Sequence, residues 1–112
     1  GSMAENQASV QEVAEMTVQC LNENVPSNLP GITFLSGGQS DVNATAHLDA
    51  MNKIGGFPWK LSFSYGRALQ QPSLKAWLGK KDNIPHAQDA LSHRALMNKL
   101  AANGAWNPSL EN

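Results

Sequence analysis

Two short stretches of the sequence combine serine, glycine and arginine in a way that suits the binding of phosphate. Ser36-Gly37-Gly38 follows the apolar run Ile32–Leu35, and Ser64-Tyr65-Gly66-Arg67 follows a second stretch rich in apolar residues. Glycine lets the backbone approach a ligand closely and leaves N–H groups free to donate hydrogen bonds to an anion. The serine hydroxyls are further donors, and a guanidinium group binds phosphate oxygens in pairs.

Both stretches lie where a strand is expected to end and a helix to begin. Ile32–Leu35 is short, rich in β-branched and aromatic residues, and bounded by glycine on both sides, which predicts a buried strand. From Trp59 to Tyr65 apolar side chains alternate with lysine and serine, which is the period of a strand. A helix between the two strands indicates a parallel pair, and such strands carry function at their carboxyl ends. The two stretches are therefore expected to form one phosphate-binding site, with the positive ends of the following helices aimed at it.

Each stretch also has a simpler explanation. A pair of glycines after a strand is most often only a turn, and an arginine such as Arg67 is most often a surface or ion-pair residue. No stronger candidate is found elsewhere, since Gly79-Lys80-Lys81 lacks the earlier glycine and the following serine or threonine of a P-loop. No nucleophile can be paired with a base, and no cofactor is expected. No metal site is expected either, because three histidines share no ligand spacing: His47, His86 and His93.

The composition is typical of one small domain. The chain has 112 residues, of which 41% are hydrophobic and 15% charged, with a net charge of −1. The lack of a basic excess disfavours nucleic-acid binding, and no apolar run approaches the roughly 18 residues of a membrane span. Cys20 is the only cysteine, so it is expected to be at least partly buried and the protein to be cytoplasmic. Gly1-Ser2 before Met3 is interpreted as the remnant of a cleaved tag, which leaves 3–112 as the domain.

Four helices are expected around the two strands, in the order α-β-α-β-α-α. Ser9 with Glu12 is typical of a capping box, Ser40 can cap the second helix, and Pro72 is typical of a first helical turn. The residues after Asn103-Gly104 are expected to form a loose tail. The helices are predicted over residues 10–23, 41–53, 72–80 and from Pro85 to Asn103-Gly104.

Several side chains can be assigned to the core or to the surface from their spacing. Trp77, together with Leu74 and Leu78, is expected in the core, because the three recur at helical spacing. Asp41 and Asp49 are expected on helix surfaces or in a first helical turn.

Three segments also resemble one known family. The segments "PGITFLSGGQS", "FSYGRALQ" and "LKAWLGKK" are similar, almost letter for letter, to class I fructose-bisphosphate aldolase, and the similarity runs in order from about Val10 to Trp106. The chain resembles the C-terminal part of that family, whose fold is a TIM (β/α)₈ barrel. The resemblance implies a lyase of glycolysis, which cleaves fructose 1,6-bisphosphate through a Schiff base.

The resemblance also implies a place in the barrel and a set of ligands. Ile32–Leu35 and Leu61–Tyr65 would be strands seven and eight, whose following loops often bind phosphate in this fold. The residues that would bind a phosphate of the sugar are Ser36, Gly37, Ser64, Gly66 and Arg67, and Gly38 would shape the loop.

The sequence departs from the family in its length and in its lysines. A complete barrel takes about 250 residues, so these 112 residues are interpreted as about the last third of one. No lysine matches the family's Schiff-base lysine, because Lys60 lies at the wrong end of its predicted strand. The chain alone is therefore expected to be inactive and to keep a half-site for a sugar phosphate.

A fragment of this kind also has open strand edges. A sheet of two parallel strands leaves both edges unpaired and is only marginally stable without further cover. A homo-oligomer that forms through these edges is therefore expected, with no nucleic acid and no membrane as partner. The alternative function is a non-catalytic structural or interaction module that reuses the βα scaffold as an oligomer.

Overall fold

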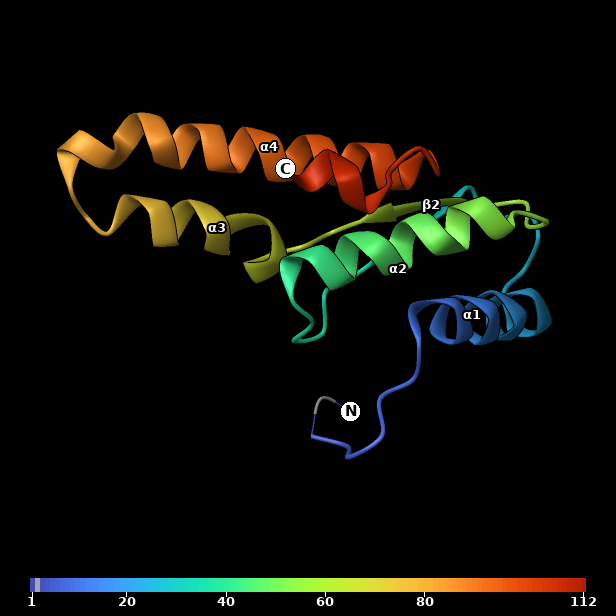
Figure 1. The fold of residues 1–112 in the computed structure, drawn as a ribbon. Coiled ribbons are helices and arrows are strands. Elements are labelled where there is room, and N and C mark those ends of the chain that lie inside the picture. The colour runs from blue at the N-terminus through green and yellow to red at the C-terminus, as the bar shows by residue number, and fades with distance from the viewer. Residues whose placement is uncertain (2) are drawn as a thin grey trace.

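The structure is a computed structural model that describes Gly1 and residues 3–112, so the interpretation of residues 1–2 as a tag remnant falls partly outside the described residues. The predicted order α-β-α-β-α-α is confirmed, with two short 3₁₀ segments added (Figure 1). The elements are α1 (Val10–Asn24), β1 (Gly31–Phe34), α2 (Asp41–Ile54), β2 (Lys60–Phe63), α3 (Arg67–Trp77), η1 (Lys81–Asn83), α4 (Ile84–Ala102) and η2 (Pro108–Glu111).

The two strands pair in parallel, as their connection through α2 predicts. Ile32 lies opposite Leu61, and Phe34 lies opposite Phe63. The pairing continues one residue beyond β2, because the N–H of Ser64 donates to the carbonyl of Phe34 at 2.8 Å. Both strands therefore end at the same edge of the sheet, and this end is where the two serine- and glycine-containing stretches begin.

The core lies between one face of the sheet and three of the helices. Side chains of α1, α2 and α4 pack there with those of β1 and β2, and Leu48 is fully buried at its centre. The alternation along each strand sends apolar side chains to this face and small polar ones to the other. The apolar set is Ile32, Phe34, Leu61 and Phe63, whereas Thr33 on the opposite face is exposed.

The predicted helix caps of α1 and α2 are present. The hydroxyl of Ser9 accepts a hydrogen bond from the N–H of Glu12 at 3.1 Å, and that of Ser40 accepts one from the N–H of Asn43 at 3.2 Å. Each bond satisfies an N–H group that the first helical turn leaves without a partner. The cap at Ser40 fixes where α2 begins, immediately after the glycine pair.

Helix α3 begins five residues earlier than predicted. The carbonyl of Gly66 accepts hydrogen bonds from the N–H groups of Leu69 and Gln70, so the helix starts at Arg67 and Pro72 lies inside it. A proline in this position removes the hydrogen bond that its own N–H would donate. The first-turn signal of Pro72 was therefore misleading, because tertiary packing against α4 and α2 outweighs the local preference for a later start.

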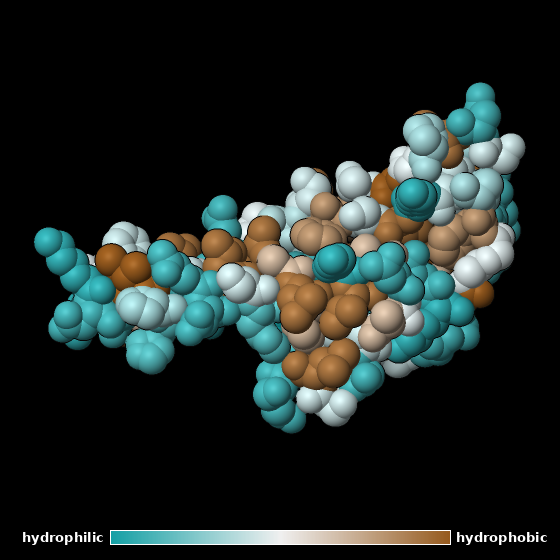
Figure 2. Space-filling view, turned by 90° about the horizontal axis from the view of Figure 1, so that it is seen from above, coloured by the Kyte–Doolittle hydropathy of each residue, from teal (hydrophilic) through white to brown (hydrophobic). Residues whose placement is uncertain are grey.

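Helix α3 and the first part of α4 form an antiparallel arm that extends away from the sheet (Figure 1), whereas Met97 and Ala101 in the later part of α4 lie in the core. The prediction that Trp77, Leu74 and Leu78 lie in the core is wrong, since Trp77 is 43% exposed and the two leucines are more so. Apolar atoms are also visible along this arm when it is seen from above (Figure 2). The reason is that Trp77 lies in an open groove beside Ile84 and Leu91 of α4, and Leu74 and Leu78 line a second open groove along α3. None of the helices in the described part of the chain is long and apolar enough to cross a membrane.

Three smaller expectations are also corrected. Cys20 is exposed, because α1 is covered on one side only. Asp49 is buried, since it bonds to the backbone of Trp106 and to Lys53. The first strand is not buried as predicted, since none of the residues Gly31–Phe34 is fully buried, and it ends at Phe34, which leaves Leu35 75% exposed.

Candidate functional site

The first part of the candidate site is a tight turn at the end of β1. The N–H of Gln39 donates to the carbonyl of Ser36 at 3.0 Å, which closes the turn around Gly37 and Gly38. Both glycines have a positive φ, 60° and 81°, a conformation that other residues rarely adopt. No atom lies within 4 Å of a Cβ built on either glycine. The glycines are thus required by backbone conformation, and the space above the turn is open to a ligand.

The second part is the start of α3, at the end of β2. Gly66 is the residue before the helix, and in the described chain no side chain caps this helix. The N–H groups of an uncapped first turn carry a partial positive charge. The guanidinium of Arg67, the first residue of α3, adds a full positive charge at the same end. This end of α3 therefore attracts anions.

A buried hydrogen bond joins the two parts. Tyr65 stands between Ser64 and Gly66, and its hydroxyl donates to the carbonyl of Ala44 in the first turn of α2 at 2.8 Å. Burial raises the pKa of Tyr65 to about 12, so the phenol remains a neutral donor at ordinary pH. The bond fixes the exit of β2 against the helix that follows the exit of β1.

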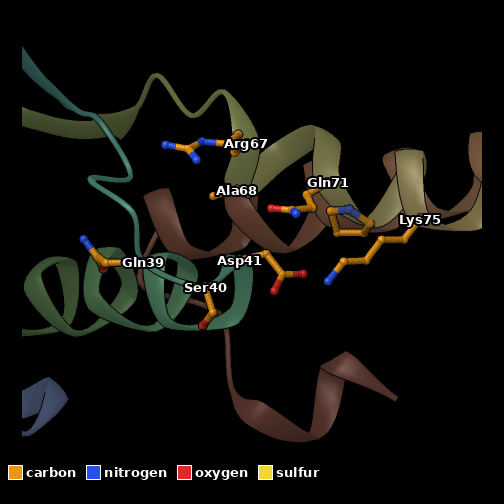
Figure 3. A pocket seen from close by; sticks show the side chains of 8 residues that line it. Gln39, Ser40, Asp41, Arg67, Ala68, Gln71 and Lys75 are labelled. Carbon is orange, nitrogen blue, oxygen red and sulfur yellow. The ribbon is translucent and has the colours of Figure 1, made fainter. Parts of the chain in front are cut away.

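A cleft of about 210 Å³ lies between the start of α2 and α3 (Figure 3). Two cations line it, Arg67 and Lys75, together with one carboxylate, Asp41. In Figure 3 the guanidinium of Arg67 extends toward the segment that leads into α2. The remaining lining residues are Gln39, Ser40, Ala68, Gln71 and Pro72. The cleft therefore combines a net positive charge with amide and hydroxyl groups, which suits a polar anion.

The structure brings the sequence-predicted residues to one edge of the sheet, but only Arg67 lines the cleft. The other five, Ser36, Gly37, Gly38, Ser64 and Gly66, follow the two strand ends beside it. Gln71 and Lys75 were missed by the sequence analysis. They lie four and eight residues after Arg67, on the same side of a helix. The sequence did not indicate this relation, because the helix was expected to begin only at Pro72, after Arg67 and Gln71.

The face of the sheet away from the helices carries a row of hydroxyl groups. By the alternation of the strands, Thr33, Ser62 and Ser64 point to this face. Thr33 and Ser64 are exposed, and Ser62 is half-buried. A polar ligand at the edge of the sheet could therefore extend over this face and find hydrogen-bond partners.

The two lysines near the sheet, Lys53 and Lys60, do not reach the candidate site at the ends of β1 and β2. Lys60 begins β2, at the end of the strand opposite to Ser64. Lys53 is bound elsewhere, with its Nζ 2.6 Å from a carboxylate oxygen of Asp49 and 2.6 Å from the carbonyl oxygen of Trp106. Among the described residues, the lysine that lines the cleft is Lys75 on α3.

The comparisons with known proteins agree on one family. A family model described as "Glycolytic: Fructose-bisphosphate aldolase class-I" matches residues 1–112. The chain is 56% identical over 107 residues to a Xylella fastidiosa protein named "Probable fructose-bisphosphate aldolase class 1", with 95% of this chain and 32% of the relative covered. It is 54% identical over 95 residues to a cytoplasmic isozyme of fructose-bisphosphate aldolase from Cicer arietinum, with 84% of this chain and 26% of the relative covered.

A solved structure gives the same result for the fold. It is the fructose-bisphosphate aldolase of Plasmodium falciparum in complex with TRAP and a small-molecule inhibitor, which superposes with a TM-score of 0.90 at 44% identity. The match covers 96% of this chain and 31% of that chain, so the present chain spans about a third of the length of the relatives. With these matches, and with its parallel strands and glycine-containing strand ends, the chain belongs to the class I fructose-bisphosphate aldolase family.

Proposed function

We propose that the edge of the sheet formed by the ends of β1 and β2 binds a phosphate group of a sugar phosphate, with fructose 1,6-bisphosphate as the ligand. The observation that carries this proposal is the parallel register, which ends both strands at one edge and sets the open Ser36–Gln39 turn beside the uncapped start of α3. Backbone N–H groups of the turn, the first turn of α3 and the guanidinium of Arg67 would together bind the phosphate oxygens.

The identity of the ligand comes from the family. Relatives are named for fructose-bisphosphate, and the resemblance assigns Ser36, Gly37, Ser64, Gly66 and Arg67 to one of its phosphates. The place of β1 and β2 as strands seven and eight of a (β/α)₈ barrel stays a prediction of that resemblance. A cytoplasmic location also stays a prediction, supported by the name of the isozyme from Cicer arietinum.

The experiment that tests the binding proposal is an amide NMR titration of labelled protein with fructose 1,6-bisphosphate. Saturable shifts confined to Ser36–Gly38 and Gly66-Arg67 are expected, and fructose without phosphate should leave the same signals unchanged. A well-dispersed spectrum without shifts at these residues would contradict the proposal and would leave a folded chain that does not bind the family's ligand.

We also propose that the chain alone does not cleave sugar phosphates. The chemistry of class I aldolases requires an amine nucleophile that forms a Schiff base with the substrate carbonyl. Lys60 lies at the far end of β2, and Lys53 is engaged with Asp49 and the backbone of Trp106. Lys75 lines the cleft, but it lies on helix α3 and not on a strand, where the resemblance places the Schiff-base lysine. Incubation with dihydroxyacetone phosphate and borohydride should give no covalent adduct. An adduct with the mass of the reduced Schiff base would contradict this expectation.

The alternative function is an oligomeric module without catalysis. Two observations favour it: each strand has only one partner in the described chain, and the α3–α4 arm exposes Leu74, Trp77 and Leu78. Both the open edges and the apolar surface can be covered by a second copy of the chain. Sedimentation equilibrium at increasing concentration should show association. A single monomeric species at the highest concentration would exclude this alternative.

A further inference from the structure

A buried arginine links the C-terminal residues to helix α4. Arg94 is 4% exposed, and its two terminal nitrogens donate to the two carboxylate oxygens of Glu111, at 2.9 and 2.5 Å. A bidentate pair of this kind fixes the orientation of both groups. Residues 105–112, predicted to be a loose tail, are therefore bound to the body of the protein.

Further contacts hold the same tail. The indole N–H of Trp106 donates to Glu111 at 3.0 Å, and its backbone N–H donates to Asp49 at 3.0 Å. The ammonium group of Lys53 donates to the carbonyl of Trp106 at 2.6 Å. The tail is thus tied to α2 near its middle and end, and to α4 through Arg94.

The guanidinium of Arg94 also contacts the first turn of α2. Its Nη1 donates to the hydroxyl oxygen of Thr45 at 3.0 Å, and its Nε lies 3.6 Å from a carboxylate oxygen of Asp41. The Thr45 oxygen lies 3.0 Å from the carbonyl of Asp41 and 2.6 Å from the amide oxygen of Asn98. Arg94 therefore stands between the tail on one side and the first turn of α2 on the other.

That first turn is part of the candidate site. Asp41 lines the cleft with Arg67, and the preceding Ser40 both lines the cleft and caps α2. The turn Ser36–Gln39 ends at this cap. A displacement of Asp41 would therefore move the residues that surround the proposed phosphate.

We propose that Arg94 is a positioning residue, which couples the docked tail at Glu111 to the phosphate site through Asp41 and Thr45. This inference rests on the proposed function, because it concerns the residues that position that same phosphate site. Loss of the Glu111 carboxylate frees the guanidinium to move toward Asp41, the remaining carboxylate beside it. The start of α2 and the turn before it then lose the position that suits the anion.

The test uses the full chain with Glu111→Gln, which keeps the shape of the side chain and removes its charge. The matched control is Glu23→Gln, because Glu23 is an exposed glutamate on α1 that accepts a hydrogen bond from Gln19 on the same helix. With inorganic phosphate as the probe, Glu111→Gln is expected to raise the dissociation constant about fivefold, and Glu23→Gln is expected to leave it unchanged. A wild-type constant for Glu111→Gln, measured well below its unfolding temperature, would overturn the proposal.

A second readout needs no ligand. The amide signals of Ser36–Ser40, none of which is hydrogen-bonded to Arg94, should shift in Glu111→Gln and exchange their hydrogens faster. The variant Arg94→Lys should move the same signals, and combining it with Glu111→Gln should add little, since both act through one contact. If the tail only stabilises the fold, Glu111→Gln will lower the unfolding temperature and leave these amide signals unchanged. That result would overturn the proposal.

The two readouts separate this proposal from the function on which it rests. If the wild-type protein binds no phosphate but the amide signals of Ser36–Ser40 move in Glu111→Gln, the proposed function fails and the coupling is supported. If the wild-type protein binds phosphate and neither readout changes, the coupling fails and the proposed function is retained.

Discussion

Replacement of Arg67 by methionine is expected to weaken the binding of fructose 1,6-bisphosphate about 100-fold, which corresponds to about 2.7 kcal/mol. Methionine has a side chain of similar reach but no charge and no N–H groups. The substitution thus removes the only guanidinium at the start of α3, and the phosphate keeps only backbone and hydroxyl donors. The protein should remain folded, because Arg67 is exposed and substitutions of this kind usually change stability by less than about 0.5 kcal/mol.

The measurement is isothermal titration calorimetry, with the NMR titration as a check that the same residues respond. The matched control is Lys80→Met, which removes one positive charge from an exposed residue outside the cleft. The control should bind like the wild-type protein, apart from the small effect of net charge. Equal dissociation constants for Arg67→Met and Lys80→Met would mean that Arg67 does not contact the phosphate.

Replacement of Arg94 by methionine is expected to lower the free energy of unfolding by about 4 kcal/mol at pH 7. The cost arises because Glu111 keeps its charge in a largely buried position and loses the partner that donates to both of its oxygens. Thr45 loses a donor in the same step. Urea unfolding, followed by circular dichroism, measures the difference, and Glu111→Gln in the same background should restore part of the loss. A difference below about 1 kcal/mol would show that the pair does not stabilise the fold.

The difference in the free energy of unfolding between the wild-type protein and Arg94→Met should depend on pH. Desolvation alone would raise the pKa of Glu111, but the hydrogen bond and the charge of Arg94, the hydrogen bond from Trp106 and the charge of His93 lower it below its ordinary value of 4.5. A carboxyl group with a lowered pKa stabilises the folded state above its unfolded pKa, and this contribution is lost as the pH falls through the folded pKa. The stabilisation of the folded wild-type protein by Glu111 is therefore present above about pH 4.5, and the difference between the wild-type protein and Arg94→Met should shrink as the pH falls below that value.

The features that could be predicted from the sequence are those set by local interactions. Ser9 and Ser40 cap their helices as expected, since a cap depends on residues only a few positions away. The period-two alternation after Trp59 located β2 and the side that it buries. The meeting of the two strand ends followed from topology alone, because the two strands of a βαβ unit run parallel and end at the same edge.

The features that were missed depend on partners far along the chain. Trp106 is 5% exposed because it bonds to Asp49, which lies 57 residues earlier, and nothing in the tail itself indicates this contact. Likewise, nothing near Trp77 shows that the groove it lines with α4 stays open to solvent. In the site, the early start of α3 concealed Lys75, since its relation to Arg67 exists only when both residues lie on one helix.

The hydroxyl-lined face of the sheet has a consequence for how the molecule is hydrated. Water can form hydrogen bonds with Thr33, Ser62 and Ser64, so little free energy is gained when this face is removed from water. The surface that gains most from leaving water lies on the arm instead, at Leu74, Trp77 and Leu78. A contact that buries this apolar surface would therefore form away from the strand ends, and it would leave the hydroxyl-lined face accessible to small polar solutes.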